Sequence, residues 1–160
     1  MKMPILFLFG LAGCTAFGWG QTKFTATGKC EPPASPPSIE VGDRAGHSLM
    51  LAKETCTWTA PVEMEGLKST GYVVTVASDV SGPKGQDNGY VVITMDNGDK
   101  AFVRFHGSST PATMNAEGTW NYTGGTGKLK GLLGKGTYKT VNGVDEVTGE
   151  YSIGAPKPKK

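Results

Sequence analysis

The sequence predicts an all-β protein, a single closed antiparallel β-barrel of about eight strands. Short runs of β-branched and aromatic residues are separated by turn signals at intervals of about 8–12 residues. Glycine supplies 24 of the 160 residues without a strict period. Several glycines fall inside the strand-like runs, where a barrel needs bends and close backbone approaches. No segment repeats apolar residues at helical spacing.

The expected strands follow one another along the chain. They cover Thr22–Cys30, Ser48–Thr59, Tyr72–Ala77, Tyr90–Met95, Lys100–His106, Glu117–Thr123, Leu129–Leu133, Gly136–Val141 and Val147–Ile153. Two Asn-Gly pairs, Asn97-Gly98 and Asn142-Gly143, predict tight hairpin turns. The four prolines within residues 31–37 predict a loop, because proline fixes φ and has no N–H for a sheet. The polar run Ser81–Gly89 is expected to be a connection.

The chain divides into a leader, one domain and a tail. Residues 1–20 have the character of a targeting segment, because Lys2 precedes an apolar run that is too short to span a bilayer, which takes ~20 residues. Residues 21–153 are the predicted barrel domain, and a length of 160 residues suits one domain. Residues 154–160 are expected to be a disordered basic tail.

Two ways of processing the leader are open. Leu11-Ala-Gly-Cys14 resembles a bacterial lipobox, in which Cys14 is lipidated and anchors the protein to the cell envelope. Ordinary signal-peptide cleavage between Gly20 and Gln21 is the alternative, because Gly18 and Gly20 supply small residues at the required offsets. Both predict a secreted protein, periplasmic or extracellular, whose membrane contact is limited to a lipid on Cys14.

The two remaining cysteines, Cys30 and Cys56, then lie in an oxidising compartment, where two thiols most simply pair as a disulfide. Two free buried thiols are the alternative. No metal site is predicted, because the close Cys-x-x-Cys spacing of structural zinc is missing from the sequence.

Strand alternation assigns an inner face. One side of the second strand carries Met50, Ala52, Glu54, Cys56 and Trp58. If Cys56 meets Cys30, this side faces the barrel interior, and Glu54 is a carboxylate among apolar neighbours. A buried carboxylate needs a partner or a raised pKa. Glu54 is therefore expected to pair with Arg104, or with a Lys or Tyr near a barrel end, or to orient a ligand or transfer a proton.

Five residues are candidates for binding a ligand in the barrel: Glu54, Trp58, Arg104, His106 and Tyr122. Arg104 and His106 share a strand face, which is either a pocket wall or an outer face. The aromatic residues either line a cavity or fill a small barrel. The other histidine, His47, is expected in an ion-paired loop with Asp43 and Arg44.

The sequence does not favour nucleic-acid binding, phosphate binding by a Walker loop or serine-hydrolase catalysis. The net charge is +2, and three lysines lie in the tail, so no clustered basic face predicts nucleic acid as a partner. Gly124–Lys128 lacks the remaining residues of a phosphate-binding Walker loop, and no nucleophile elbow of a serine hydrolase is present. No cofactor is predicted.

The glycine-rich segment carries a family resemblance. Gly124-Gly-Thr-Gly-Lys-Leu129, followed by Gly131, Gly134 and Gly136, resembles the final hairpins of allene-oxide-cyclase-like and dirigent-like barrels. Gly149-Glu-Tyr151 is similar to the closing strand of small secreted bacterial proteins of unknown function. The resemblance implies a β-barrel that handles small hydrophobic molecules, and no catalytic residue of either family aligns with this chain.

Three functions follow as expectations. The first is non-catalytic binding of a small apolar or aromatic ligand in the barrel. The second is a structural or interaction role in the cell envelope. The third is an enzyme of the cyclase or isomerase type that uses Glu54, the weak catalytic candidate. The sequence leaves the oligomeric state open.

Overall fold

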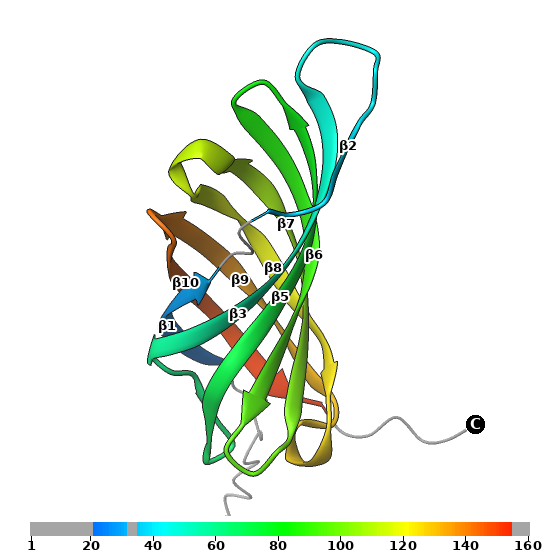
Figure 1. The fold of residues 1–160 in the computed structure, drawn as a ribbon. Helices are drawn as coiled ribbons and strands as arrows, with labels where there is room; N and C mark the ends of the chain where they lie inside the picture. The colour runs from blue at the N-terminus through cyan, green and yellow to red at the C-terminus, as the bar shows by residue number, and fades with distance from the viewer. Residues whose placement is uncertain (1–20, 32–34, 155–160) are drawn as a thin grey trace, which may run out of the picture.

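The computed structural model describes residues 21–31 and 35–154, which form a closed eight-stranded antiparallel barrel (Figure 1). The predicted fold class is thus confirmed. The predicted leader with Cys14 and the tail from residue 155 lie outside the described residues. The barrel strands are β1 (Thr22–Glu31), β3 (His47–Ala60), β5 (Leu67–Ser81), β6 (Lys84–Met95), β7 (Lys100–Thr110), β8 (Asn115–Gly125), β9 (Leu132–Val141) and β10 (Val144–Ile153).

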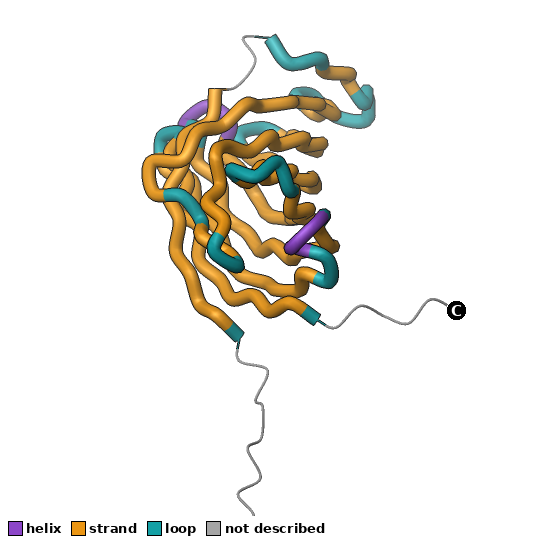
Figure 2. The backbone as a smooth tube through the Cα atoms, turned by 90° about the horizontal axis from the view of Figure 1, so that it is seen from below, coloured by secondary structure: helices purple, strands orange, loops and turns teal. Residues whose placement is uncertain are grey.

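The topology is an up-and-down meander. Each barrel strand pairs with the next along the chain, and β1 pairs with β10, so the first and last strands close the ring seen along the barrel in Figure 2. Two further strands are short. β2 (Ser38–Glu40) pairs with β3, and β4 (Glu63–Met64) pairs with β5. Within the described residues, no helix is long and apolar enough to cross a membrane.

Some of the predicted strand boundaries agree with the structure and others are wrong. Asn142 and Gly143 both adopt positive φ, 51° and 77°, in the tight β9–β10 turn. Ser81–Gly89 is not a connection, because β5 reaches Ser81 and β6 starts at Lys84. Its inward positions, Gly85, Asp87 and Gly89, are small or acidic, so this part of β6 lacks the apolar alternation that marks a strand. The predicted segments Leu129–Leu133 and Gly136–Val141 are instead the short helix η2 (Gly127–Leu129) and the single strand β9.

The disulfide prediction is confirmed. Cys30 on β1 lies directly opposite Cys56 on β3, and the two sulfurs are bonded. Their bond lies on the inward side of the barrel, as the alternation of both strands predicts, and Met50, Ala52, Glu54 and Trp58 face the interior with it.

One end of the barrel is closed by side chains. The β3–β5, β6–β7 and β8–β9 connections lie at the lower end of the barrel in Figure 1. The buried apolar residues in or beside these connections are Val62, Met64, Leu67, Met95, Leu129 and Leu132, each at most 6% exposed. The β4 segment is held over this end because the N–H of Val62 donates to Oγ of Ser69, 2.9 Å away. The barrel therefore has a packed floor.

Candidate functional site

The barrel encloses a cavity of about 420 Å³ above this floor. Cavities of this size hold small molecules in other proteins. The wall is mostly apolar and aromatic, and its members include Phe24, Ala52, Trp58, Tyr72, Val74, Val91, Ile93, Val103, Phe105, Trp120, Tyr122, Tyr138 and Val147. Each comes from an inward position of its strand, so the period-two alternation of the strands creates the wall directly.

The end opposite the floor forms the mouth. Its rim carries Pro36, Pro111 and Met114, together with Gly143 of the β9–β10 turn. Met114 follows the short helix η1 (Pro111–Thr113), has a positive φ of 50° and is 53% exposed. Its carbonyl accepts a hydrogen bond from the N–H of Gly143, 3.1 Å away. An exposed apolar side chain is thus held at the entrance by its own backbone.

Three carboxylates face this apolar interior: Glu54 on β3, Asp87 on β6 and Asp145 on β10. Asp145 has partners, because the hydroxyls of Tyr72 and Thr140 each donate to it over 2.7 Å. The ring of Tyr72 reaches Asp145 across Gly28, where a Cβ would lie 2.9 Å from the ring carbon Cε1. Glycine at this position of β1 therefore makes room for the Tyr72–Asp145 bond.

Glu54 lies beside the disulfide. Its carboxylate is within 4.8 Å of the sulfurs of Cys30 and Cys56, and Cys30 Sγ is 3.5 Å from Oδ2 of Asp145. Burial raises the pKa of Glu54, and the negative charges of Asp145 and Asp87 raise it further. Bonded sulfurs are not thiolates, so the Glu54–cysteine group is not a metal site as it stands.

Asp87 carries a buried carboxylate oxygen without a partner among the described residues. Its side chain is only 6% exposed, and Oδ1 has no hydrogen-bond partner among the described residues. Asp87 lies opposite Gly107, and the hydroxyl of Tyr138 occupies the space above that glycine without a partner of its own. The indole N–H of Trp58 is a third buried polar group without a described partner. Buried groups of this kind usually have partners in folded proteins.

Burial in the cavity raises the pKa of Tyr72 and Tyr138. Burial raises the pKa of Tyr138, and the negative charges of Asp87 and Asp145 add to the effect. Burial likewise raises the pKa of Tyr72, with a further contribution from Asp145. Both hydroxyls therefore stay neutral in the cavity at ordinary pH.

The sequence-predicted site residues separate into two groups. Glu54, Trp58 and Tyr122 line the cavity. Arg104 and His106 lie exposed on the outer face of β7, so the expected Glu54–Arg104 pair does not form, and the outer-face alternative for this strand face holds. Odd and even positions of one strand face opposite sides, and Phe105 between them points inward.

Sequence reasoning missed Asp87, Asp145 and Tyr72 as cavity residues. Asp87 fell in a segment assigned to a connection, and Asp145 preceded the predicted start of the last strand. The detectable signal was the hairpin turn at Asn142-Gly143, because extending the strand back to this turn places Asp145 on the inward side with Val147.

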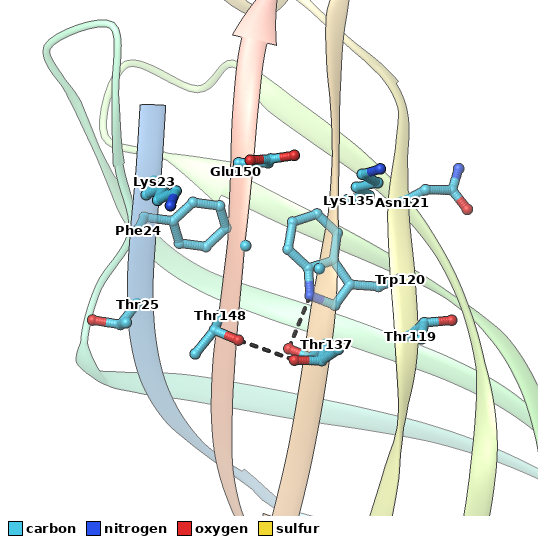
Figure 3. A pocket seen from close by; sticks show the side chains of 12 residues that line it. Lys23, Phe24, Thr25, Thr119, Trp120, Asn121, Lys135, Thr137, Thr148 and Glu150 are labelled. Carbon is cyan, nitrogen blue, oxygen red and sulfur yellow. Dashed lines mark hydrogen bonds between the residues drawn. The ribbon is translucent and has the colours of Figure 1, made fainter. Parts of the chain in front are cut away.

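A second concavity lies on the outer face of β1, β10, β9 and β8 (Figure 3). It has a volume of about 890 Å³ and is open to solvent, and threonines and charged side chains such as Lys23 and Glu150 surround it. Although larger, it is a shallow depression of the sheet. The smaller interior cavity is the better candidate site, because it lies inside the barrel, has a mostly apolar wall and contains buried polar groups without a partner among the described residues.

No protein-family model and no curated protein matches this chain. Among solved structures, it is similar to a protein of unknown function from the DUF3224 family of Shewanella oneidensis MR-1, with a TM-score of 0.58 and 15% sequence identity over 85% of this chain and 100% of that chain. It also matches pyocyanin demethylase, with a TM-score of 0.45 and 18% identity over 79% of this chain and 99% of that chain. The first similarity shows a shared β-barrel fold. The DUF3224 structure is not named as allene-oxide-cyclase-like or dirigent-like, so what is shown of the resemblance is the β-barrel fold alone.

Proposed function

We propose that this protein is an exported, non-catalytic binding protein that holds a small apolar or aromatic ligand inside its barrel. The observation that carries the proposal is the cavity of about 420 Å³ inside the barrel, with an apolar and aromatic wall. Its floor is packed and its mouth carries the exposed side chain of Met114, so a ligand enters from one end. An apolar wall of this kind favours ligand binding through loss of water-exposed apolar surface.

Export is the second part of the proposal. The Cys30–Cys56 disulfide supports it, because disulfides persist in oxidising compartments and are rare in the cytosol. The apolar leader of residues 1–20 supports it from the sequence. Cleavage after Gly20 and lipidation of Cys14 are the two forms of this proposal, and they differ in whether the barrel is free or tethered to a membrane.

Binding of N-phenylnaphthylamine tests the ligand proposal. This neutral dye becomes fluorescent in apolar surroundings. We expect saturable binding of one dye per barrel. Ala52 lines the cavity, so Ala52→Phe should weaken binding at least about tenfold, or ~1.4 kcal/mol, by filling the space. Ala77→Phe is the matched control, since Ala77 is exposed on the outer face of the neighbouring strand β5. Circular dichroism spectra that match the wild type are the check that both variants fold.

The two other candidate functions are outcomes of this experiment. Failure of the wild-type barrel to bind any apolar dye would contradict the proposal and favour a structural or interaction role in the envelope. A catalytic role has one observation in its favour, the raised pKa of Glu54 in an apolar cavity. It becomes the better candidate if a bound compound emerges chemically changed from the wild-type protein and unchanged from Glu54→Gln.

A further inference from the structure

The geometry points to a hydrophobic cation as the ligand of the cavity: an organic amine or quaternary ammonium whose apolar or aromatic body fills the barrel and whose positive charge faces Glu54, Asp87 and Asp145. This inference rests on the proposed function and names its ligand class. It is carried by the charge balance inside the barrel, by the unpartnered Asp87 and by the spacing of the carboxylates.

The charge balance of the cavity is one-sided. Three carboxylates line it, and no Lys, Arg or His side chain among the described residues does so. Arg104, which the sequence suggested as the counter-ion of Glu54, is exposed on the outer face of β7. Asp145 accepts hydrogen bonds from Tyr72 and Thr140, but Glu54 and Asp87 have no positively charged partner in the cavity lining that the structure describes. A cation from outside the chain would stabilise their charged forms.

Asp87 gives this cation a position. Oδ1 of Asp87 and the hydroxyl of Tyr138 are buried and have no hydrogen-bond partner in the part of the chain that the structure describes. The Tyr138 hydroxyl lies above Gly107, which faces Asp87. An ammonium N–H donates to a carboxylate and to a tyrosine oxygen alike, so one amine satisfies both groups. A quaternary ammonium offers the charge without the donor.

The carboxylates are too far apart for a metal ion. Within the described residues, the one set of three or more ligating side chains whose ligand atoms lie within 4.8 Å of one another is Cys30, Glu54 and Cys56, and its cysteines are bonded to each other. Glu54, Asp87 and Asp145 therefore do not form a compact ligand set. Both oxygens of Asp145 already accept hydrogen bonds. A diffuse organic charge matches carboxylates that are spread over a wall better than a compact dication does.

The aromatic wall favours the same ligand class. Trp58 and Tyr72 lie with their ring centroids 4.1 Å apart, and Phe105 and Tyr138 meet edge to face at 5.6 Å. Aromatic faces attract cations through the ring quadrupole, and aromatic cages bind quaternary ammonium groups. The same rings bury the apolar body of the ligand.

Three probes with the same naphthylmethyl body test the inference: the cation naphthylmethyl-trimethylammonium, its neutral isostere neopentylnaphthalene, and the anion naphthylacetate. Each competes with N-phenylnaphthylamine for the wild-type protein. We expect the cation to bind at least about tenfold more tightly than the neutral isostere, and the anion to bind most weakly. Neutral binding equal to or tighter than cation binding would overturn the inference and leave the apolar-ligand proposal standing. Absence of binding by all three probes and the dye would overturn both.

Asp87→Asn removes one charge with almost no change of shape. We expect it to lower the affinity for the cation about tenfold and to leave the neutral isostere unchanged. Asp96→Asn is the matched control, because Asp96 is exposed in the β6–β7 turn and does not line the cavity. An equal loss for the cation and the neutral isostere in Asp87→Asn would contradict a charge effect, and so would displacement of the cation by millimolar calcium.

The wild-type protein provides a second measurement that does not depend on the variant folding. The titratable groups that face the cavity are Glu54, Asp87, Asp145 and the hydroxyls of Tyr72, Tyr122 and Tyr138. As the pH falls from about 7.5 to about 4.5, Glu54, whose pKa burial raises, takes up a proton and the cavity loses negative charge, while the tyrosines stay neutral. Cation affinity should fall over this range and neutral affinity should stay constant; a pH-independent cation affinity would overturn the inference.

Discussion

At the scale of single residues, the clearest charge network is the loop before β3. The side chain of His47 lies between two carboxylates: Nε2 is 2.8 Å from Oδ1 of Asp79, and Nδ1 faces Asp43. Arg44 also pairs with Asp43, at 2.6 Å. The ion-paired loop expected for His47, Asp43 and Arg44 is thus present, and Asp79 on β5 joins it. Hydrogen bonding to Asp43, and then to Asp79, raises the pKa of His47 above its usual 6.5.

This network predicts a pH-dependent stability. A raised folded-state pKa stabilises the protein fully below the unfolded pKa of His47, and the contribution is lost as pH rises through the folded pKa. His47→Gln should therefore lower the unfolding temperature most near about pH 6 and least near about pH 9. Thermal unfolding of both proteins across this range checks it. His106→Gln is the control, since His106 is exposed on β7 and its one side-chain hydrogen bond within the described residues joins its Nε2 to Oγ1 of Thr119. A His47→Gln effect that does not vary with pH would contradict the prediction.

At the scale of the strands, aromatic rings cover glycines across the sheet. One register row runs through Phe24, Gly149, Gly136 and Trp120, on β1, β10, β9 and β8. The indole of Trp120 lies over both glycines, and its Nε1 donates to the carbonyl of Thr137 over 3.2 Å, as Figure 3 shows. The ring of Phe24 packs beside it, with centroids 5.7 Å apart. Missing side chains here let the sheet bend and the rings fill the interior.

Gly149→Ala should disrupt this arrangement. An added Cβ would lie 2.6 Å from the carbonyl oxygen of Lys135 and 2.8 Å from Cη2 of Trp120, so backbone or indole must move. We expect a loss of about 1–3 kcal/mol in the free energy of unfolding, measured by urea denaturation. Gly154→Ala is the comparison, because its Cβ would meet no atom closer than 3.4 Å, and it should change stability by less than about 0.5 kcal/mol. Equal stabilities of the two variants would argue against a packing role for Gly149.

At the scale of the whole molecule, closure of the barrel depends on the pairing of β1 with β3, which we call the β1–β3 seam. β1 pairs with β10 over eight residue pairs and β3 with β5 over ten, but β1 pairs with β3 over five, with a register shift at Thr27–Gly28. The Cys30–Cys56 disulfide lies within this β1–β3 seam. Among neighbouring strands of the barrel, a covalent bond thus joins the pair with the fewest paired residues that the structure describes, and this bond lies beside Glu54 in the cavity wall.

Removing the disulfide should therefore weaken the barrel globally. A loop of 26 positions corresponds to a chain-entropy contribution of ~3.5 kcal/mol. The double variant Cys30→Ser with Cys56→Ser should lose a comparable amount in urea unfolding. Adding reductant should lower the stability of the wild-type protein and leave the double variant unchanged. Wild-type protein that unfolds at the same urea concentration with and without reductant would contradict a stabilising disulfide.

The sequence by itself determined the barrel class, the disulfide and the inward direction of Glu54 and Trp58. These follow from local rules: alternation fixes which side a residue faces, Asn142-Gly143 fixes a hairpin, and two thiols in an oxidising compartment pair. Local rules could not place Arg104, because a strand face with charged and aromatic residues suits either side of a sheet. They also missed Asp87, because the inward residues of this part of β6 are small or polar and do not show the apolar alternation that predicts a strand.

Only the tertiary structure decided what the interior contains. It brings Glu54, Asp87 and Asp145 from three separate strands to one cavity and leaves Arg104 outside, so the charge balance of the site depends on contacts between distant parts of the chain. Sequence spacing carries no information on which strands meet across a closed barrel until their register is known. The glycine-rich segment predicted that the sheet closes, and the closure itself created the enclosed acidic and aromatic cavity.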